Sequence, residues 1–97
     1  MKTFVENVIE ICNEIGITRD HIKIEYDKTR HSMIEITLPH HIFNIYETDF
    51  EHFNDVMSAC AATTVYEVYR NDECVFIGND MYDLMFYELL KTVLKNV

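Results

Sequence analysis

The sequence predicts a single α+β domain, residues 1–97, in which an antiparallel sheet of four or five strands packs against three helices. Segments with apolar residues at helical spacing alternate along the chain with short segments in which every second residue is apolar. The chain also contains only two Gly and one Pro, which leaves little room for long loops. Because short connections favour antiparallel neighbours, the expected order of elements is α-β-β-(β)-α-β-β-α.

The first helix is predicted over residues 3–15. Its apolar residues form one stripe, and Gly16 follows as a helix stop. Thr3 and Glu6 have the spacing of a capping box, in which the hydroxyl and the carboxylate satisfy each other's free backbone N–H groups. The local chemistry therefore predicts both ends of this helix.

Two further helices are predicted later in the chain. Thr48 and Glu51 repeat the capping-box spacing, and an apolar helical face follows as far as Cys60. Either Asn79 or Asp80 is expected to cap the last helix. The residues of that helix that we expect to face the core include Leu84, Met85, Leu89 and Val93.

Alternating apolar and polar residues predict the strands. Asn71 and Asp72 are expected to form the turn of the last hairpin, because both residue types are common in tight turns. Residues 41–47, after Pro39, fit the alternation less well, so the sequence leaves a third strand open. The segments with the clearest alternation are residues 21–27, 32–38, 63–70 and 73–78.

The charge excludes several classes of function. The chain has 17 acidic and 8 basic residues, a formal net charge of −9. Direct binding to nucleic acid needs clustered Lys and Arg, and so does attachment to an anionic membrane surface. No apolar run approaches the roughly 20 residues of a membrane span. Glu6 and Glu10 also interrupt the segment that a signal peptide would keep apolar, so the sequence predicts a cytoplasmic protein.

No motif for catalysis or metal binding stands out. The three cysteines are widely spaced without a CxxC, which favours free thiols. His52 shares a predicted helical face with Asp49 and Asp55, but it has no second strong ligand, so we expect neither a metal nor a cofactor. The adjacent His40 and His41 would point to opposite faces of a strand. No serine has a Gly-rich turn or a nearby base, so the chain is not expected to be an enzyme.

Carboxylates recur in rows along the predicted helices. Glu6, Glu10 and Glu14 are spaced four residues apart, and Glu51 and Asp55 repeat this spacing. Like charges at that spacing cost a helix about 0.2–0.5 kcal/mol per pair. Either the rows are solvated faces of an ordinary acidic protein, or they imitate rows of phosphates for a basic partner. The candidate partner-binding residues are Glu6, Glu10, Glu14, Glu47, Asp49, Glu51, Asp55, Asp80 and Asp83.

In its size, charge and carboxylate rows, the chain resembles the small acidic DNA-mimic and anti-restriction proteins of tailed phages, and also small anti-CRISPR proteins. This resemblance implies a non-enzymatic inhibitor that occupies the DNA-binding groove of a restriction or CRISPR nuclease, in the host cytoplasm if a phage encodes it. The order of elements also resembles that of class I type III secretion chaperones. That second resemblance implies an acidic cytoplasmic chaperone or adaptor that binds an effector segment.

A homodimer is also expected. An exposed sheet edge is a liability that pairing with a second copy can cover. Tyr66 and Tyr69 lie in one predicted strand and suggest aromatic surface on both faces of the sheet. Besides the inhibitor and the chaperone, a third alternative for the function is an accessory protein that oligomerises through an apolar surface.

The first testable prediction concerns metal. Purified protein should contain no stoichiometric metal and should keep its melting temperature after chelator treatment, because His52 lacks a second strong ligand. Metal analysis, with melting curves before and after chelation, checks this. Stoichiometric zinc with a large fall in melting temperature on chelation would contradict it.

Overall fold

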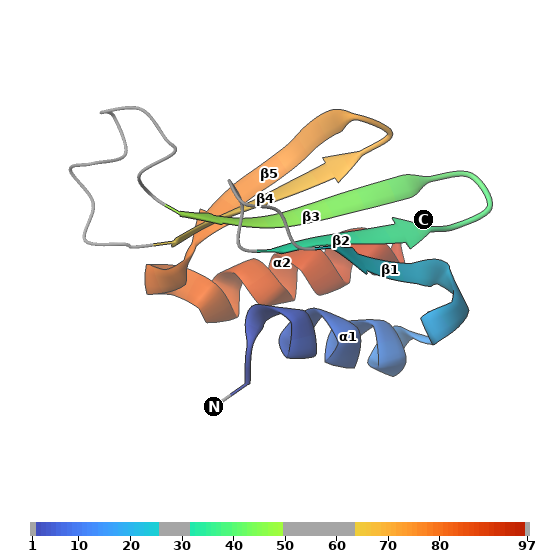
Figure 1. The fold of residues 1–97 in the computed structure, drawn as a ribbon, viewed down its shortest axis with the longest axis horizontal. Helices are drawn as coiled ribbons and strands as arrows, with labels where there is room; N and C mark the ends of the chain where they lie inside the picture. Colours follow the sequence, from blue (N-terminus) through green and yellow to red (C-terminus); the bar gives the residue numbers. More distant parts are fainter. Residues whose placement is uncertain (1, 26–31, 50–63, 97) are drawn as a thin grey trace.

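The computed structural model describes residues 2–25, 32–49 and 64–96, and it shows helices packed on one face of an antiparallel sheet (Figure 1). The helical elements within these residues are α1 (Phe4–Ile15), η1 (Arg19–His21), η4 (Asp80–Tyr82) and α2 (Asp83–Lys95). The strands are β1 (Ile22–Glu25), β2 (Ser32–Thr37), β3 (Ile42–Asp49), β4 (Thr64–Arg70) and β5 (Glu73–Asn79).

The strands form one sheet in the order β1-β2-β3-β4-β5, so each strand pairs with its neighbours in sequence. All four pairings are antiparallel. The inward row of the sheet crosses it through Ile34, Ile45 and Val68, which are fully buried partners in the register. The predicted α+β class with an antiparallel sheet is therefore confirmed, and the edges of the sheet are β1 and β5.

The third strand, which the sequence left open, is present as β3 and extends beyond the predicted segment. Thr48 pairs with Val65 and Asp49 pairs with Thr64, so both residues lie in the strand. The prediction that a helix begins at Thr48 is wrong, because strand pairing takes precedence over the capping-box spacing there. The rest of the predicted second helix lies in residues 50–63, outside the described residues.

Both predicted ends of α1 are confirmed. The Thr3 hydroxyl accepts a hydrogen bond from the backbone N–H of Glu6, and the Glu6 carboxylate accepts one from the backbone N–H of Thr3, each at 3.1 Å. Gly16 ends the helix at φ +88°, in the left-handed region that glycine adopts at little cost. These local signals act within a few residues, which is why the sequence alone was sufficient to find them.

The hairpin of β4 and β5 turns at the predicted residues. Asn71 and Asp72 have φ of 50° and 69°, as in the tight turn whose twist matches paired strands. Further along, Val68 pairs with Phe76 and Tyr69 pairs with Cys74, which leaves one extra residue in β5 as a bulge. The bulge makes β5 an irregular edge of the sheet.

Three of the four residues that were predicted to face the core from α2 do not. Leu84, Met85 and Leu89 are exposed, with 77%, 64% and 50% of their surface accessible, whereas Val93 is partly buried and packs against the core, as predicted. The helix instead buries a row offset by one residue, which consists of Phe86, Leu90 and Leu94. The helix has two adjacent apolar rows, and the contacts of Phe86 with its neighbours place the row that contains Phe86 in the core.

Four aromatic rings join both helices to the sheet. Phe4 of α1 stacks on Tyr66 of β4 with ring centroids 5.0 Å apart, and Phe86 of α2 lies 4.7 Å from Tyr66. Tyr87 completes the group at 5.3 Å from Phe86. Tyr66 is thus buried in the core and supplies no surface, contrary to the prediction. Tyr69 lies on the opposite face, where its ring contacts Tyr46.

Gly78 of β5 leaves the space that the Phe86 ring occupies. A Cβ atom at Gly78 would lie 2.8 Å from Cδ1 of Phe86, closer than carbon atoms approach. We therefore expect Gly78→Ala to lower the free energy of unfolding by about 1–3 kcal/mol through overpacking. Chemical denaturation of the parent and the variant measures this change.

A double-mutant cycle tests whether the Phe86 ring causes this loss. Combined with Phe86→Leu, the alanine at position 78 should cost less than it does alone, because the ring that it meets is gone. An equal cost in both backgrounds would contradict the packing described here.

Candidate functional site

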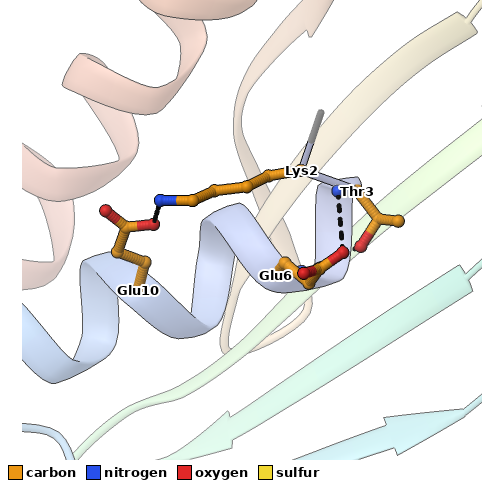
Figure 2. Close-up of polar contacts among 4 residues, drawn as sticks. All are labelled: Lys2, Thr3, Glu6 and Glu10. Carbon is orange, nitrogen blue, oxygen red and sulfur yellow. Dashed lines mark hydrogen bonds and ion pairs between the residues drawn. The ribbon is translucent and has the colours of Figure 1, made fainter.

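The first two carboxylates of the α1 row already have partners in the fold. Glu6 belongs to the capping box, and the hydrogen bond that the Thr3 backbone donates lowers the pKa of its carboxyl group. Lys2 forms an ion pair with Glu10 across two turns (Figure 2). Two of the three charges in this row are therefore engaged near the start of the helix.

The third carboxylate of the row connects the two helices. Nζ of Lys91 on α2 donates to Oε2 of Glu14 at 2.7 Å. This hydrogen bond and the charge of Lys91 lower the pKa of Glu14. Lys2 precedes Glu10 by eight residues, and Lys91 lies on the other helix, 77 residues from Glu14. The row that looks free of lysine in the sequence is therefore partly neutralised in the structure.

The two helices run parallel. Near their starts the rings of Phe4 and Tyr87 lie 6.5 Å apart, and near their ends Glu14 meets Lys91. Both helices therefore begin at the same end of the molecule, where β3 ends and β4 begins (Figure 1). This arrangement brings together carboxylates that lie far apart in the sequence.

Three of the predicted residues meet at this end. Glu47 of β3 pairs with Tyr66 of β4, and its negative charge acts on the hydroxyls of both Tyr66 and Tyr87. The charge of Asp80 acts on Tyr66, and that of Asp83 acts on Tyr87. We call Glu47, Asp80 and Asp83 the acidic end.

The tyrosines report the electrostatics of the acidic end. Burial raises the pKa of Tyr66 above its ordinary value, and the charges of Tyr87, Glu47 and Asp80 raise it further. Burial also raises the pKa of Tyr87. Negative charges so close to a phenol disfavour its ionised form, so both hydroxyls stay protonated and can donate hydrogen bonds at neutral pH.

The carboxylates of the acidic end sit on regular structure. Glu47 accepts a hydrogen bond from the Ser32 hydroxyl at 3.2 Å, and Asp83 is the first residue of α2. In the described part of the chain, neither Glu47 nor Asp83 forms an ion pair with a lysine or arginine. Asp49 ends β3 at the same place, whereas Glu51 and Asp55 lie outside the described residues.

Sequence reasoning missed an apolar surface at the β5 edge. A groove of about 320 Å³ runs between β5 and α2 and is lined by Ile77, Gly78, Asn79, Tyr82, Met85 and Leu89. Met81 and Leu84 are also exposed beside it. We call Ile77, Met81, Tyr82, Leu84, Met85 and Leu89 the apolar surface. The sequence of α2 contains two adjacent apolar rows, and only one of them can face the core. This was the signal that could have revealed the apolar surface.

A second cavity lies at the opposite end of the molecule. Its volume is about 440 Å³, and its lining comes from the ends of both helices and from the connection between β2 and β3. His40 and His41 both line it, because they lie in that connection and not in a strand. Nδ1 of His41 is 3.2 Å from the Asn71 amide nitrogen. The histidines are thus well separated from the acidic end.

The cysteines and the metal-type side chains show no reactive arrangement within the described ranges. Cys12 is free and buried, and burial raises the pKa of its thiol to about 11. Cys74 is free and exposed on β5, and Cys60 lies outside the described residues. No group of three His, Cys, Asp or Glu side chains that could hold a metal ion occurs in residues 2–25, 32–49 and 64–96.

Neither of the described α-helices combines the length and the apolar character that crossing a membrane requires.

Comparison with known proteins finds no match to the chain among family models, curated proteins or solved structures.

Proposed function

We propose that this chain is a non-enzymatic inhibitor that binds a basic, nucleic-acid-handling protein through its acidic end. The observation that carries the proposal is the contrast between two groups of carboxylates. Glu10 and Glu14 on α1 have lysine partners, whereas the fold gathers Glu47 and Asp83 at one end without such partners in the described residues. The acidic end is therefore the part of the predicted set best suited to meet a basic protein.

The net charge and the rigidity of this end both support such binding. A formal charge of −9 steers a basic partner toward the chain and raises the rate of association. The carboxylates are mounted on β3, η4 and the start of α2, so little ordering is needed when a partner binds. Asp49, Glu51 and Asp55 are the next acidic residues after Glu47 in the sequence, and they stay predicted contacts.

The target class follows from what carboxylates can imitate. Fixed negative charges resemble the phosphates of a nucleic-acid backbone, which basic grooves bind largely through electrostatic contacts. The proposed target is a nuclease of host defence, of the restriction or CRISPR type. A chaperone or adaptor role is the second candidate, and the exposed groove between β5 and α2 is the observation that favours it.

A pair of charge-matched variants tests the proposal. Glu47→Gln, Asp80→Asn and Asp83→Asn together remove the acidic end. The control combines Glu10→Gln, Glu14→Gln and Glu25→Gln, which removes three carboxylates that each have a lysine partner. Both variants reduce the net charge equally, so only the position of the charge differs between them.

Each protein is immobilised and used to capture proteins from a lysate of its source or host cell, with duplex DNA as competitor. The parent and the control should retain a basic nucleic-acid-binding protein that DNA displaces and that rising salt releases. The acidic-end variant should bind it about tenfold more weakly or worse, a loss of about 1.4 kcal/mol. Equal losses in both variants, or binding by the acidic-end variant at the level of the parent, would contradict the proposal.

A further inference from the structure

The cavity of about 440 Å³ lies at the end of the molecule opposite the acidic end, where both helices finish and β2 turns into β3 (Figure 1). Ile17 and Leu94, two of its lining residues, belong to the hydrophobic core. Pro39 and His40 also line it but are exposed. The cavity therefore extends from the solvent to the core, and its volume is within the range of small-molecule sites, about 300–1,000 Å³.

Hydrogen bonds hold both walls of this cavity in place. On the helix side, the backbone N–H of Ile17 donates to the carbonyl of Cys12 at 2.8 Å, which turns Ile17 back against the core. On the sheet side, the backbone N–H of Leu38 donates to the carbonyl of His41 at 2.9 Å and closes the connection between β2 and β3. Because these walls are already ordered, a ligand needs little rearrangement of the protein in order to bind.

His41, which lines the cavity, has a defined hydrogen-bond donor. The Asn71 side chain meets the backbone N–H of Ile42 at 2.9 Å, so the atom of Asn71 at that contact is its oxygen. The amide NH2 group of Asn71 then donates to Nδ1 of His41 at 3.2 Å. Since Nδ1 accepts, the neutral imidazole carries its proton on Nε2, which is left to donate to a ligand.

The charge of the lining is opposite to the charge of the chain. Acidic residues outnumber basic ones by 17 to 8 in the sequence, but among the described residues that line the cavity none is acidic and Lys95 is basic. Lys95 forms no ion pair within the described part of the chain. Its charge acts on Glu14, whose carboxylate already has Lys91 as its partner. Lys95 is therefore available to an anion.

The ends of the two helices weaken this positive charge only in part. Backbone carbonyls give a helix end a partial negative charge, which disfavours an anion within the last turn. At the end of α1, the carbonyl of Cys12 is occupied by the N–H of Ile17. At the end of α2, the carbonyl of Thr92 accepts from Nδ2 of Asn96 at 2.9 Å. These bonds reduce the partial charges, whereas the ammonium group of Lys95 can pair with an anion directly.

We propose that this cavity binds a small organic monocarboxylate, with the apolar body of the ligand against Ile17 and Leu94 and its carboxylate paired with Lys95. The imidazoles of His40 and His41 also line the cavity and supply further donors. A single lysine matches a single negative charge, whereas a phosphate dianion would meet stronger repulsion from a chain of net charge −9. The site lies away from the acidic end, so it goes beyond the inhibitor role and does not depend on it.

Octanoate is the probe for this site, with octanamide as the neutral ligand of equal length and octylammonium as the ligand of opposite charge. Each is titrated into the full chain and followed by NMR of the backbone amides. Octanoate should bind saturably, with the largest shifts at residues 15–17, 38–41 and 94–95, which form or adjoin the lining. The other two ligands should bind at least about threefold more weakly, because they cannot pair with Lys95.

Lys95→Gln tests the ion pair, with Lys23→Gln as the matched control. Lys23 is exposed on β1, outside the cavity, and pairs with Glu25. Both variants remove one positive charge, so a change in net charge affects them equally. Lys95→Gln should raise the dissociation constant of octanoate about threefold or more, and Lys23→Gln should leave it unchanged. Melting curves verify that both variants stay folded.

Several results would overturn the proposal. One is the absence of saturable octanoate binding at millimolar concentration, and another is octanamide or octylammonium binding as tightly as octanoate. Shifts confined to the apolar surface would place the ligand elsewhere and would contradict the proposal too. An equal loss of affinity in both variants, or no loss in Lys95→Gln, would show that Lys95 does not hold the carboxylate.

Discussion

The contact of Phe4 and Phe86 with Tyr66 is the interaction on which the rest of the structure depends. It fixes the start of α1 and the start of α2 against the same strand, with ring centroids 5.0 and 4.7 Å from Tyr66. Stacked and tilted aromatic pairs add about 0.5–1.5 kcal/mol each beyond the burial of their area. Gly78 makes the contact possible, because any side chain there would meet the Phe86 ring.

Both candidate surfaces follow from this one contact. Asp83 lies one helical turn before Tyr87 on α2, and Glu47 pairs with Tyr66 in the sheet, so the contact of Tyr66 with Phe86 brings these carboxylates to the same end of the molecule. Because Phe86 faces inward, its neighbours Met85 and Leu89 must face outward beside β5. One part of the molecule thus gathers carboxylates, and another exposes apolar side chains.

The sequence predicted the features that depend on nearby residues. The capping box of Thr3 and Glu6 and the turn at Asn71–Asp72 act within a few residues, and the alternation of apolar residues predicted the sheet. Features that depend on distant partners were not accessible. Periodicity could not choose between two adjacent apolar rows of α2, and the spacing of Glu14 could not reveal Lys91 on the other helix.

The ionisation of Tyr66 and Tyr87 tests most directly whether the fold gathers the acidic end around these rings. It is followed by NMR of the tyrosine ring carbons, with circular dichroism to confirm that the protein stays folded. Both phenols should ionise at higher pH than a free phenol, whose pKa is about 10, so stability should fall as the pH rises above that value. Replacing Glu47, Asp80 and Asp83 by their amides should shift this ionisation to lower pH, because the nearby negative charges are gone. Identical titration of the two tyrosines in parent and variant would contradict the account.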